Sequence, residues 1–384
     1  MIGNSYQLIW VIIYYVADRI QNNNDMGTNE SSTSVIQSKQ HFLILDGLRG
    51  IAALAVVVFH FMEWIYEPSK NFIAHGFLAV DFFFCLSGFV IAYAYDNRIE
   101  VLGIKTFFKL RLIRLHPLVL LGSVLGLLGF FLDPFANEAA AYSSGMIALV
   151  FLSSIFLVPF PIMEERFFNL FNFNAPAWSL FWEYVANILY ALILRKLSRT
   201  ILFLLALLAA IGICMIADRT ENLMGGWAKS NFWDGGVRVA YSFLAGMLVY
   251  RSNWIIKNKL GFTGLTVLLL LAFLMPFGKW NWLTESFAVI IYFPLIVSLG
   301  AGTILSERGK SICKFSGDIS YPLYMTHYAF IWIFGHYFLK YKPGTTELAI
   351  VITCGTVLLI AVSYLVMKFY DTPVRKYLHR RWNK

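Results

Sequence analysis

The sequence has 384 residues, of which 59% are hydrophobic and only 14% are charged. This composition excludes an ordinary soluble domain and predicts a membrane protein with several spans. The formal net charge of +9 does not by itself indicate a nucleic-acid partner, because the cytoplasmic loops of membrane proteins concentrate lysine and arginine.

The N-terminal residues 1–40 differ in character from the rest of the chain. A short apolar run at residues 8–16 is followed by a polar stretch rich in asparagine, serine and threonine. The run is too short to span a bilayer, and the polar stretch offers little apolar surface to bury. We therefore expect residues 1–40 to form a poorly ordered or interfacial extension, with Met26 as an alternative start of the protein.

The first predicted span, residues 43–64, is apolar except for Asp46, Arg49, His60 and Glu63. Its length of about 22 residues suits a bilayer crossing. Arg49 and His60 lie 11 positions apart, which corresponds to about three helical turns and about 16 Å, so the two side chains share one face. Ionisable side chains inside a membrane are costly and usually functional. We therefore expect Arg49 and His60 to face the interior of the bundle.

Nine further spans follow this helix in the predicted topology. An apolar stretch at residues 145–160 is too short to be another span and is predicted to be re-entrant or interfacial. With the N-terminus inside, the inner segments then carry most of the lysine and arginine residues, as the positive-inside rule requires. The sequence therefore predicts an all-α, polytopic membrane protein of about ten transmembrane helices, with both termini in the cytoplasm and a basic tail at residues 376–384. The nine predicted spans are 77–95, 114–132, 178–194, 200–217, 237–250, 261–277, 285–305, 318–338 and 347–367.

A pair of arginines precedes the third predicted span. The stretch FFKLRLIRLHP, residues 107–117, places Arg111 and Arg114 three positions apart in a predicted cytoplasmic loop, and they share a face if the helix begins early. Guanidinium groups grip phosphate in a forked geometry, but arginines at this place can instead fix topology and contact lipid headgroups. If the pair lies beside Arg49, the cations converge at the mouth of a cavity with His60 on its far wall, a layout suited to a long phosphorylated donor.

Glu183 lies in the stretch NAPAWSLFWEY, which opens the fourth predicted span. Counted from the outer end of the spans, Glu183 and His60 are matched in depth to within about one turn. A carboxylate near a histidine raises its basicity and fixes its tautomer, as a general base requires. We therefore expect Glu183 to orient His60; the alternative is that Glu183 pairs with Arg238.

The stretch SGDISYPLYMTHYAF, residues 316–330, belongs mostly to the ninth predicted span. Tyr321, Tyr324 and His327 are spaced by three positions and share one helix face. His327 is expected near the middle of the membrane, where it contacts the donor chain or the substrate. The alternative is a structural histidine packed among aromatic side chains.

Weaker candidates lie in the second predicted span. Asp81 is near its outer end, and Ser87 is near its middle beside Gly88, a small pair that also suits close helix packing. The cysteines show no paired spacing, so neither a disulfide framework nor a zinc site is predicted, and we expect all of them to be packing residues. They are Cys85, Cys214, Cys313 and Cys354.

Taken together, these stretches resemble the acyltransferase 3 family of integral membrane acyltransferases, which includes O-antigen and exopolysaccharide O-acetylases. The resemblance runs from about Phe42 to about Arg375, so residues 41–375 are expected to form the acyltransferase domain, without a hydrolase-like domain after the last span. The chain departs from the family where Phe-Trp-Glu-Tyr replaces the commoner run of two acidic residues. The matching stretches are LDGLRGIAALAVVVFH, FLAVDFFFCLSGFVI, RLIRLHP, APAWSLFWEY and ISYPLYMTH, and the matching functional positions are Arg49, His60, Arg111, Arg114, Glu183 and His327.

The resemblance implies transfer of an acetyl or other short acyl group from cytoplasmic acetyl-CoA, or another acyl-CoA, to a hydroxyl of an envelope glycan such as lipopolysaccharide, or of a glycolipid. It places the protein in the bacterial inner membrane and calls for no metal. His60 would act as general base or transient acyl carrier and Glu183 would orient it. The donor phosphates would contact Arg49, Arg111 and Arg114, and the donor channel or substrate site would include Asp81, Ser87, Tyr324, His327 and Arg238.

Two other classes of protein remain open at this point. Intramembrane charges also mark the path of a transporter or flippase, although the chain shows no internal repeat and no matched pair of broken helices. A polytopic glycan polymerase or ligase is the second alternative, although the long predicted outer loop at residues 133–177 is apolar and poor in charge.

Overall fold

A computed structural model describes residues 42–382, and the regular structure of this part of the chain is entirely helical, with no β-strand. The predicted all-α class is therefore confirmed. The expected extension at residues 1–40 and the alternative start at Met26 lie outside the described residues. The α-helices are α2 Leu43–Ile65, α3 Ala79–Tyr95, α4 Ile99–Leu102, α5 Ile104–Leu132, α6 Ser144–Ile155, α7 Ala177–Leu192, α8 Arg199–Thr220, α9 Phe232–Arg251, α10 Gly261–Phe273, α11 Asn281–Phe287, α12 Phe293–Gly302, α13 Glu307–Tyr341, α14 Thr345–Val366 and α15 Thr372–Trp382. Shorter 3-10 pieces are Pro68–Lys70, Gly76–Leu78, Glu138–Ala141, Leu194–Lys196 and Lys229–Asn231, and π-helical turns are Ala288–Tyr292 and Met367–Asp371.

Within residues 42–382, six helical segments are long and apolar enough to cross a membrane. The chain is therefore a multi-pass membrane protein. The remaining predicted spans also form helices, but α7 and α10 are only 16 and 13 residues long, and α9 carries Asp234 and Arg238. The count of about ten spans and the cytoplasmic location of both termini therefore stay predictions. The six segments are Leu43–Ile65, Gly76–Tyr95, Ile104–Leu132, Arg199–Thr220, Asn281–Gly302 and Thr345–Trp382.

Close helix contacts fix the position of α2 and α3. The helix α2 packs most extensively against α13, and a Cβ atom on Gly50 would lie only 2.0 Å from the Oγ of Ser316. The next most extensive contact joins α3 to α9, where a Cβ on Gly88 would lie 2.0 Å from the backbone oxygen of Phe243. The expected role of Gly88 in helix packing is thus confirmed, and the approach of α13 brings backbone groups of that helix to Arg49.

The helix α5 begins ten residues earlier than the third predicted span. Gly103 has φ 77°, a left-handed conformation that ends α4, and α5 starts at Ile104. No further glycine or proline interrupts the stretch before Pro117. Arg111 and Arg114 therefore lie inside a helix, one turn apart, and not in a loop as expected from the span boundaries.

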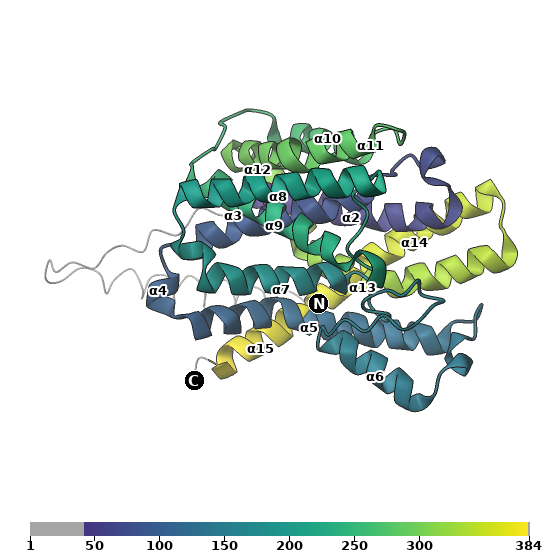
Figure 1. The fold of residues 1–384 in the computed structure, drawn as a ribbon. Helices are drawn as coiled ribbons and strands as arrows, with labels where there is room; N and C mark the ends of the chain where they lie inside the picture. The colour runs from purple at the N-terminus through teal and green to yellow at the C-terminus, as the bar shows by residue number, and fades with distance from the viewer. Residues whose placement is uncertain (1–41, 383–384) are drawn as a thin grey trace, which may run out of the picture. The chain divides into compact units, whose positions relative to one another are not determined.

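The segment predicted to be re-entrant or interfacial contains the short helix α6, which packs against α5 (Figure 1). After Ile155 the chain continues without regular helix to Ala177, and Leu157 and Phe167 adopt left-handed backbone conformations on the way. At the other end of the chain, α14 continues through a π-helical turn into α15, which lies beside α5 (Figure 1). The predicted basic tail is therefore helical as far as Trp382.

The expectation that every cysteine is a packing residue is only partly correct. Cys85 and Cys313 are buried, and both pack in the main hydrophobic core. Cys214 and Cys354 are exposed on α8 and α14. All four thiols are free.

Candidate active site

His60 lies near the end of α2 and is held by a carboxylate of the same helix. Its Nδ1 is 2.5 Å from Oε1 of Glu63, one turn further along. Nε2 makes no hydrogen bond within residues 42–382. The carboxylate can only accept when ionised, so Nδ1 carries the proton and the lone pair of Nε2 is left available. The His60 side chain is 18% exposed, which leaves it accessible to a ligand.

The orienting carboxylate is therefore Glu63 and not Glu183, which corrects the expectation from the sequence. Glu183 accepts hydrogen bonds from Nη2 of Arg111 at 2.7 Å and from Oγ of Ser87 at 3.1 Å. A count of residues along a helix gives depth but not the direction in which a side chain points, and α7 turns Glu183 toward α5. The spacing of three positions between His60 and Glu63 was the available signal in the sequence.

A second histidine packs against the ring of His60. The rings of His60 and His327 are stacked, with centroids 5.3 Å apart and an angle of 25° between planes. Nδ1 of His327 lies 3.1 Å from the carbonyl oxygen of Leu323, which can only accept, so this nitrogen carries the proton. Nε2 of His327 is buried with no partner within residues 42–382. His327 thus contacts the ring of His60, and its expected contact with the donor chain or the substrate stays a prediction.

His60 and Glu63 line a cavity of about 320 Å³. Two more of the predicted residues, Tyr324 and Arg238, line it as well, whereas Asp81, Ser87 and His327 do not. The remaining wall is mainly aromatic and includes Phe59, Trp64, Phe77, Trp178, Trp227 and Trp332.

Arg238 is a buried wall residue whose charge is fully matched. Its Nη2 lies 2.5 Å from Oδ2 of Asp81 and its Nε lies 3.1 Å from Oδ1, and the two side chains are 1% and 0% exposed. Nη1 donates to the carbonyl oxygen of Gly225 at 2.6 Å. The partner of Arg238 is therefore Asp81, and the alternative pairing with Glu183 is wrong. A buried arginine needs such a partner because desolvation costs several kcal/mol per ion.

A second charge network supports the opposite wall. Arg166, which also lines the cavity, donates to Oε2 of Glu138 at 2.8 and 3.0 Å and lies 4.7 Å above the ring of Trp332. Nε2 of His336 lies 3.1 Å from Glu138, and its Nδ1 lies 2.6 Å from Asp133. Burial raises the pKa of Glu138, but hydrogen bonds from His336 and Arg166 outweigh burial, so the pKa of this carboxyl lies below its ordinary value. The sequence did not indicate this network.

The three arginines singled out in the sequence lie near one another at the other end of α2. Arg49 donates to Oγ of Ser320 at 2.8 Å and lies 3.1 Å from Asp46, while Arg111 is held by Glu183. Arg114 is exposed and has no ion-pair partner within residues 42–382, and its charge acts on both Arg49 and Arg111. We call Arg49, Arg111 and Arg114 the arginine group.

The cavity and the arginine group are distinct places. None of the three arginines lines the cavity. Tyr324, which lines the cavity, is hydrogen bonded through its hydroxyl to Oγ of Ser179 at 2.9 Å. Ser87 donates to Glu183, the carboxylate that holds Arg111 in the arginine group.

Comparison with known proteins gives a family and several relatives. The family described as acyltransferase domain matches residues 42–368. A Rhizobium radiobacter protein named "Protein 2 in picA locus" is 34% identical over 162 residues, which are 40% of this chain and 82% of that protein. The O-acetyltransferase OatA of Staphylococcus aureus strain NCTC 8325 is 23% identical over 366 residues, which are 86% of this chain and 57% of that protein.

A Staphylococcus aureus strain COL protein, provisionally named an O-acetyltransferase, is 25% identical over 360 residues with the same coverage, 86% of this chain and 57% of that protein. The chain thus spans little more than half the length of these two Staphylococcus proteins. No solved structure matches the chain.

Proposed function

The chain belongs to the acyltransferase family whose domain matches residues 42–368, and we propose on this basis that it transfers an acetyl group from acetyl-CoA to a hydroxyl of an envelope glycan or glycolipid. The observation that carries the proposal is the His60–Glu63 pair on the wall of an aromatic cavity. Family membership and the O-acetyltransferase relatives favour this activity over a transporter and over a glycan ligase.

His60 is the proposed general base. Its Nε2 takes the proton of the acceptor hydroxyl while the hydroxyl oxygen bonds to the acyl carbon of the thioester. The carbon–sulfur bond then breaks, and the coenzyme A thiolate takes the proton back from the imidazolium. Glu63 holds the proton on Nδ1 throughout and stabilises the imidazolium that forms, because an ionised carboxylate favours the charged ring.

A covalent route uses the same atoms in a different order. Nε2 of His60 attacks the thioester carbon first, the carbon–sulfur bond breaks and the thiolate leaves, which gives an acetyl-histidine. The acceptor hydroxyl then attacks the acetyl carbon, the bond to Nε2 breaks, and the hydroxyl proton passes by way of the freed Nε2 to the thiolate. Single-turnover experiments with labelled acetyl-CoA and no acceptor separate the two routes. An acetyl-enzyme that forms in the wild type and not in His60→Ala supports the covalent route, and its absence supports direct transfer.

The arginine group is the proposed site for the phosphates of the donor. Arg114 has no ion-pair partner within residues 42–382, so it is available to a phosphate, and charge-assisted contacts of this kind are strong. If the N-terminus is cytoplasmic, the arginine group faces the compartment that holds acetyl-CoA and His60 faces the outer side. The pantetheine arm would cover the distance between them, about 16 Å along the helix.

The experiment uses the purified full-length protein in proteoliposomes with radiolabelled acetyl-CoA and envelope material from a strain that lacks the gene. We expect label to enter a glycan or glycolipid only when the protein is present. We also expect acetyl-CoA to raise the melting temperature of the protein in detergent, since a ligand that binds only the folded state stabilises it. Absence of both effects would contradict the proposal, and mass spectrometry of the labelled product identifies the acceptor.

A further inference from the structure

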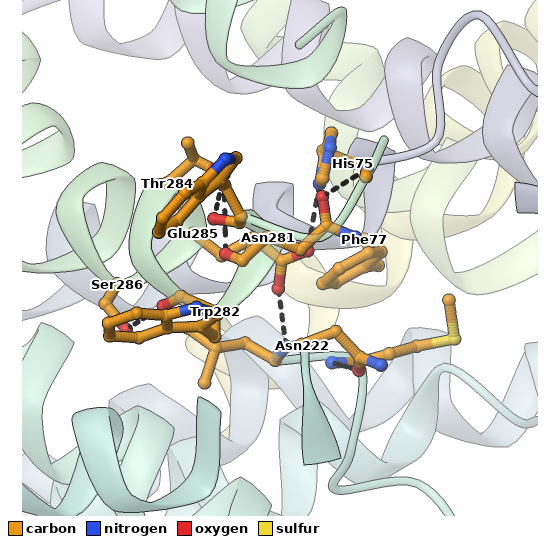
Figure 2. A network of polar contacts seen from close by, with 12 residues as sticks. His75, Phe77, Asn222, Asn281, Trp282, Thr284, Glu285 and Ser286 are labelled. Carbon is orange, nitrogen blue, oxygen red and sulfur yellow. Dashed lines mark hydrogen bonds and ion pairs between the residues drawn. The ribbon is translucent and has the colours of Figure 1, made fainter. Parts of the chain in front are cut away.

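A buried carboxylate outside the site described above joins two distant segments of the chain. Glu285 in α11 and His75 are both 0% exposed, and Oε1 of Glu285 lies 3.0 Å from Nδ1 of His75. The other oxygen, Oε2, accepts a hydrogen bond from the backbone N–H of Leu223 at 2.5 Å. Figure 2 shows the carboxylate with one oxygen toward the ring of His75 and the other toward the segment that contains Asn222.

A buried carboxylate is unfavourable unless its contacts stabilise it, so the contacts of Glu285 show which segments it holds together. Burial of an ionised carboxylate is unfavourable unless good partners offset the loss of hydration. Here the partners come from positions 210 and 62 residues away in the sequence. Glu285 therefore fixes the segment around His75 relative to the segment around Leu223.

Each of these segments supplies part of the cavity wall. Phe77 follows His75 by two positions, lines the cavity, and packs edge-on against Phe59 at 5.8 Å between centroids. Phe59 is the neighbour of His60. In the other segment, Met224 follows Leu223 directly, and Met224 and Trp227 both line the cavity.

We propose that Glu285 is a positioning residue that sets the shape of the acceptor side of the cavity. It does so by holding the segments of Phe77 and Met224 in fixed positions relative to His60. The inference rests on the proposed function, because it assigns this side of the cavity to the acceptor hydroxyl compound. Glu285 does not line the cavity and acts through the two segments that it joins.

A second side chain, Arg238, also connects the same two segments, so a variant without Glu285 is expected to fold and can be tested. Arg238 donates to the carbonyl oxygens of Phe77 at 3.4 Å and of Gly225 at 2.6 Å. Loss of Glu285 therefore leaves both segments attached through Arg238. We expect Glu285→Ala to fold and insert, with a cavity wall that is looser.

The test compares three variants of the full-length protein. Glu285→Ala removes both contacts. Glu285→Gln keeps them, because its side-chain oxygen accepts from Leu223 and its amide donates to the other tautomer of His75. The control is Glu307→Ala, which removes an exposed carboxylate that is paired with Lys310 in the same helix.

Two readouts are taken. Hydrogen exchange measured by mass spectrometry should be faster at residues 222–228 in Glu285→Ala by about tenfold, as expected for a lost buried hydrogen bond. In acetyl transfer from acetyl-CoA to octyl β-glucoside as the acceptor probe, the KM for the probe should rise by about tenfold while the KM for acetyl-CoA stays within about twofold. Glu285→Gln and Glu307→Ala should match the wild type in both readouts.

Failure of the positioning role of Glu285 can be distinguished from failure of the proposed acetyl transfer. If the wild type transfers acetyl and Glu285→Ala shows the same probe KM and the same exchange as the wild type, the positioning role is wrong. An equal rise in both KM values would also contradict it, because that result indicates a general loss of structure. If the wild type transfers no acetyl group to any acceptor, the proposed function itself fails, and the assignment to an acceptor fails with it.

Discussion

The cavity at His60 and the arginine group differ in how their charges are balanced. The arginines that line the cavity are each paired with a carboxylate, Arg166 with the partly buried Glu138 and Arg238 with the buried Asp81. In the arginine group, by contrast, Arg114 makes no ion pair within residues 42–382, although its charge acts on the carboxylate of Asp371. The guanidinium groups of the cavity wall are therefore both paired with carboxylates, while the arginine group keeps one exposed guanidinium that makes no ion pair within residues 42–382.

This difference supports the proposed placement of the two substrates at the two ends of α2. A charge that is already matched contributes to wall structure and offers little to an anion, whereas an unmatched guanidinium attracts phosphate. The aromatic cavity with paired arginines suits an uncharged hydroxyl compound, and the arginine group suits the polyanionic coenzyme A.

The largest expected effect follows from breaking the charge balance of the cavity. Asp81→Ala leaves Arg238 as a buried charge without a partner, so we expect the free energy of unfolding to fall by about 3–5 kcal/mol. Denaturation of the protein in detergent measures it. The double variant Asp81→Leu with Arg238→Met removes both charges and should recover part of the loss. A double variant less stable than Asp81→Ala would show that charge balance is not the reason for the pair.

The next effect concerns the carboxylate that orients His60. Glu63→Gln keeps the size of the side chain but removes the charge that stabilises the imidazolium, so we expect the rate of transfer to fall by about 100-fold. Stabilisation by acetyl-CoA should be unchanged. Glu183→Gln is the matched comparison, since Glu183 contacts Arg111 and not His60. A larger loss of rate in Glu183→Gln, with donor binding intact, would restore Glu183 as the orienting residue.

A smaller effect is expected at the arginine group. Arg114→Ala removes one charge-assisted contact to the donor, so the KM for acetyl-CoA should rise by about tenfold with little change in kcat. High salt should reduce the difference between the wild type and the variant, because Arg114 is exposed and its charge is screened. A fall in kcat without a change in the donor KM would place Arg114 in the chemical step.

The smallest effect concerns pH and the wall network at Glu138. Because the pKa of this carboxyl is lower in the folded protein, its contribution to stability is present above the ordinary pKa of glutamate and is lost as pH falls through the folded value. Glu138→Gln should therefore be less stable than the wild type at neutral pH, and the gap should narrow on acidification. Thermal unfolding at several pH values measures this gap, and a constant gap would contradict the role of the charge.

The sequence was sufficient for the features that depend on local spacing. The apolar run around Arg49 and His60 predicted α2 to within one residue at its C-terminal end, and the spacing of Arg111 and Arg114 placed them on one face once the helix began early. The partner of Glu183 could not be predicted, because the rotation of α7 about its axis depends on packing.

The charge networks of the cavity wall also could not be predicted from local sequence spacing. Asp133 and His336 are 203 positions apart, and Glu285 and His75 are 210 apart, yet each pair is in direct contact. Each residue alone looks like an isolated polar group in an apolar chain. Only the packing of the helices shows that these groups contact one another and hold the wall of the cavity.

The central claim is that donor binding and chemistry occur at opposite ends of α2, and His60→Ala tests it most directly when both are measured on one preparation. We expect the rise in melting temperature with acetyl-CoA to equal that of the wild type, and acetyl transfer to fall by at least about 100-fold. Transfer at the wild-type rate in His60→Ala would contradict the account, and so would loss of the acetyl-CoA effect in a variant that is otherwise folded.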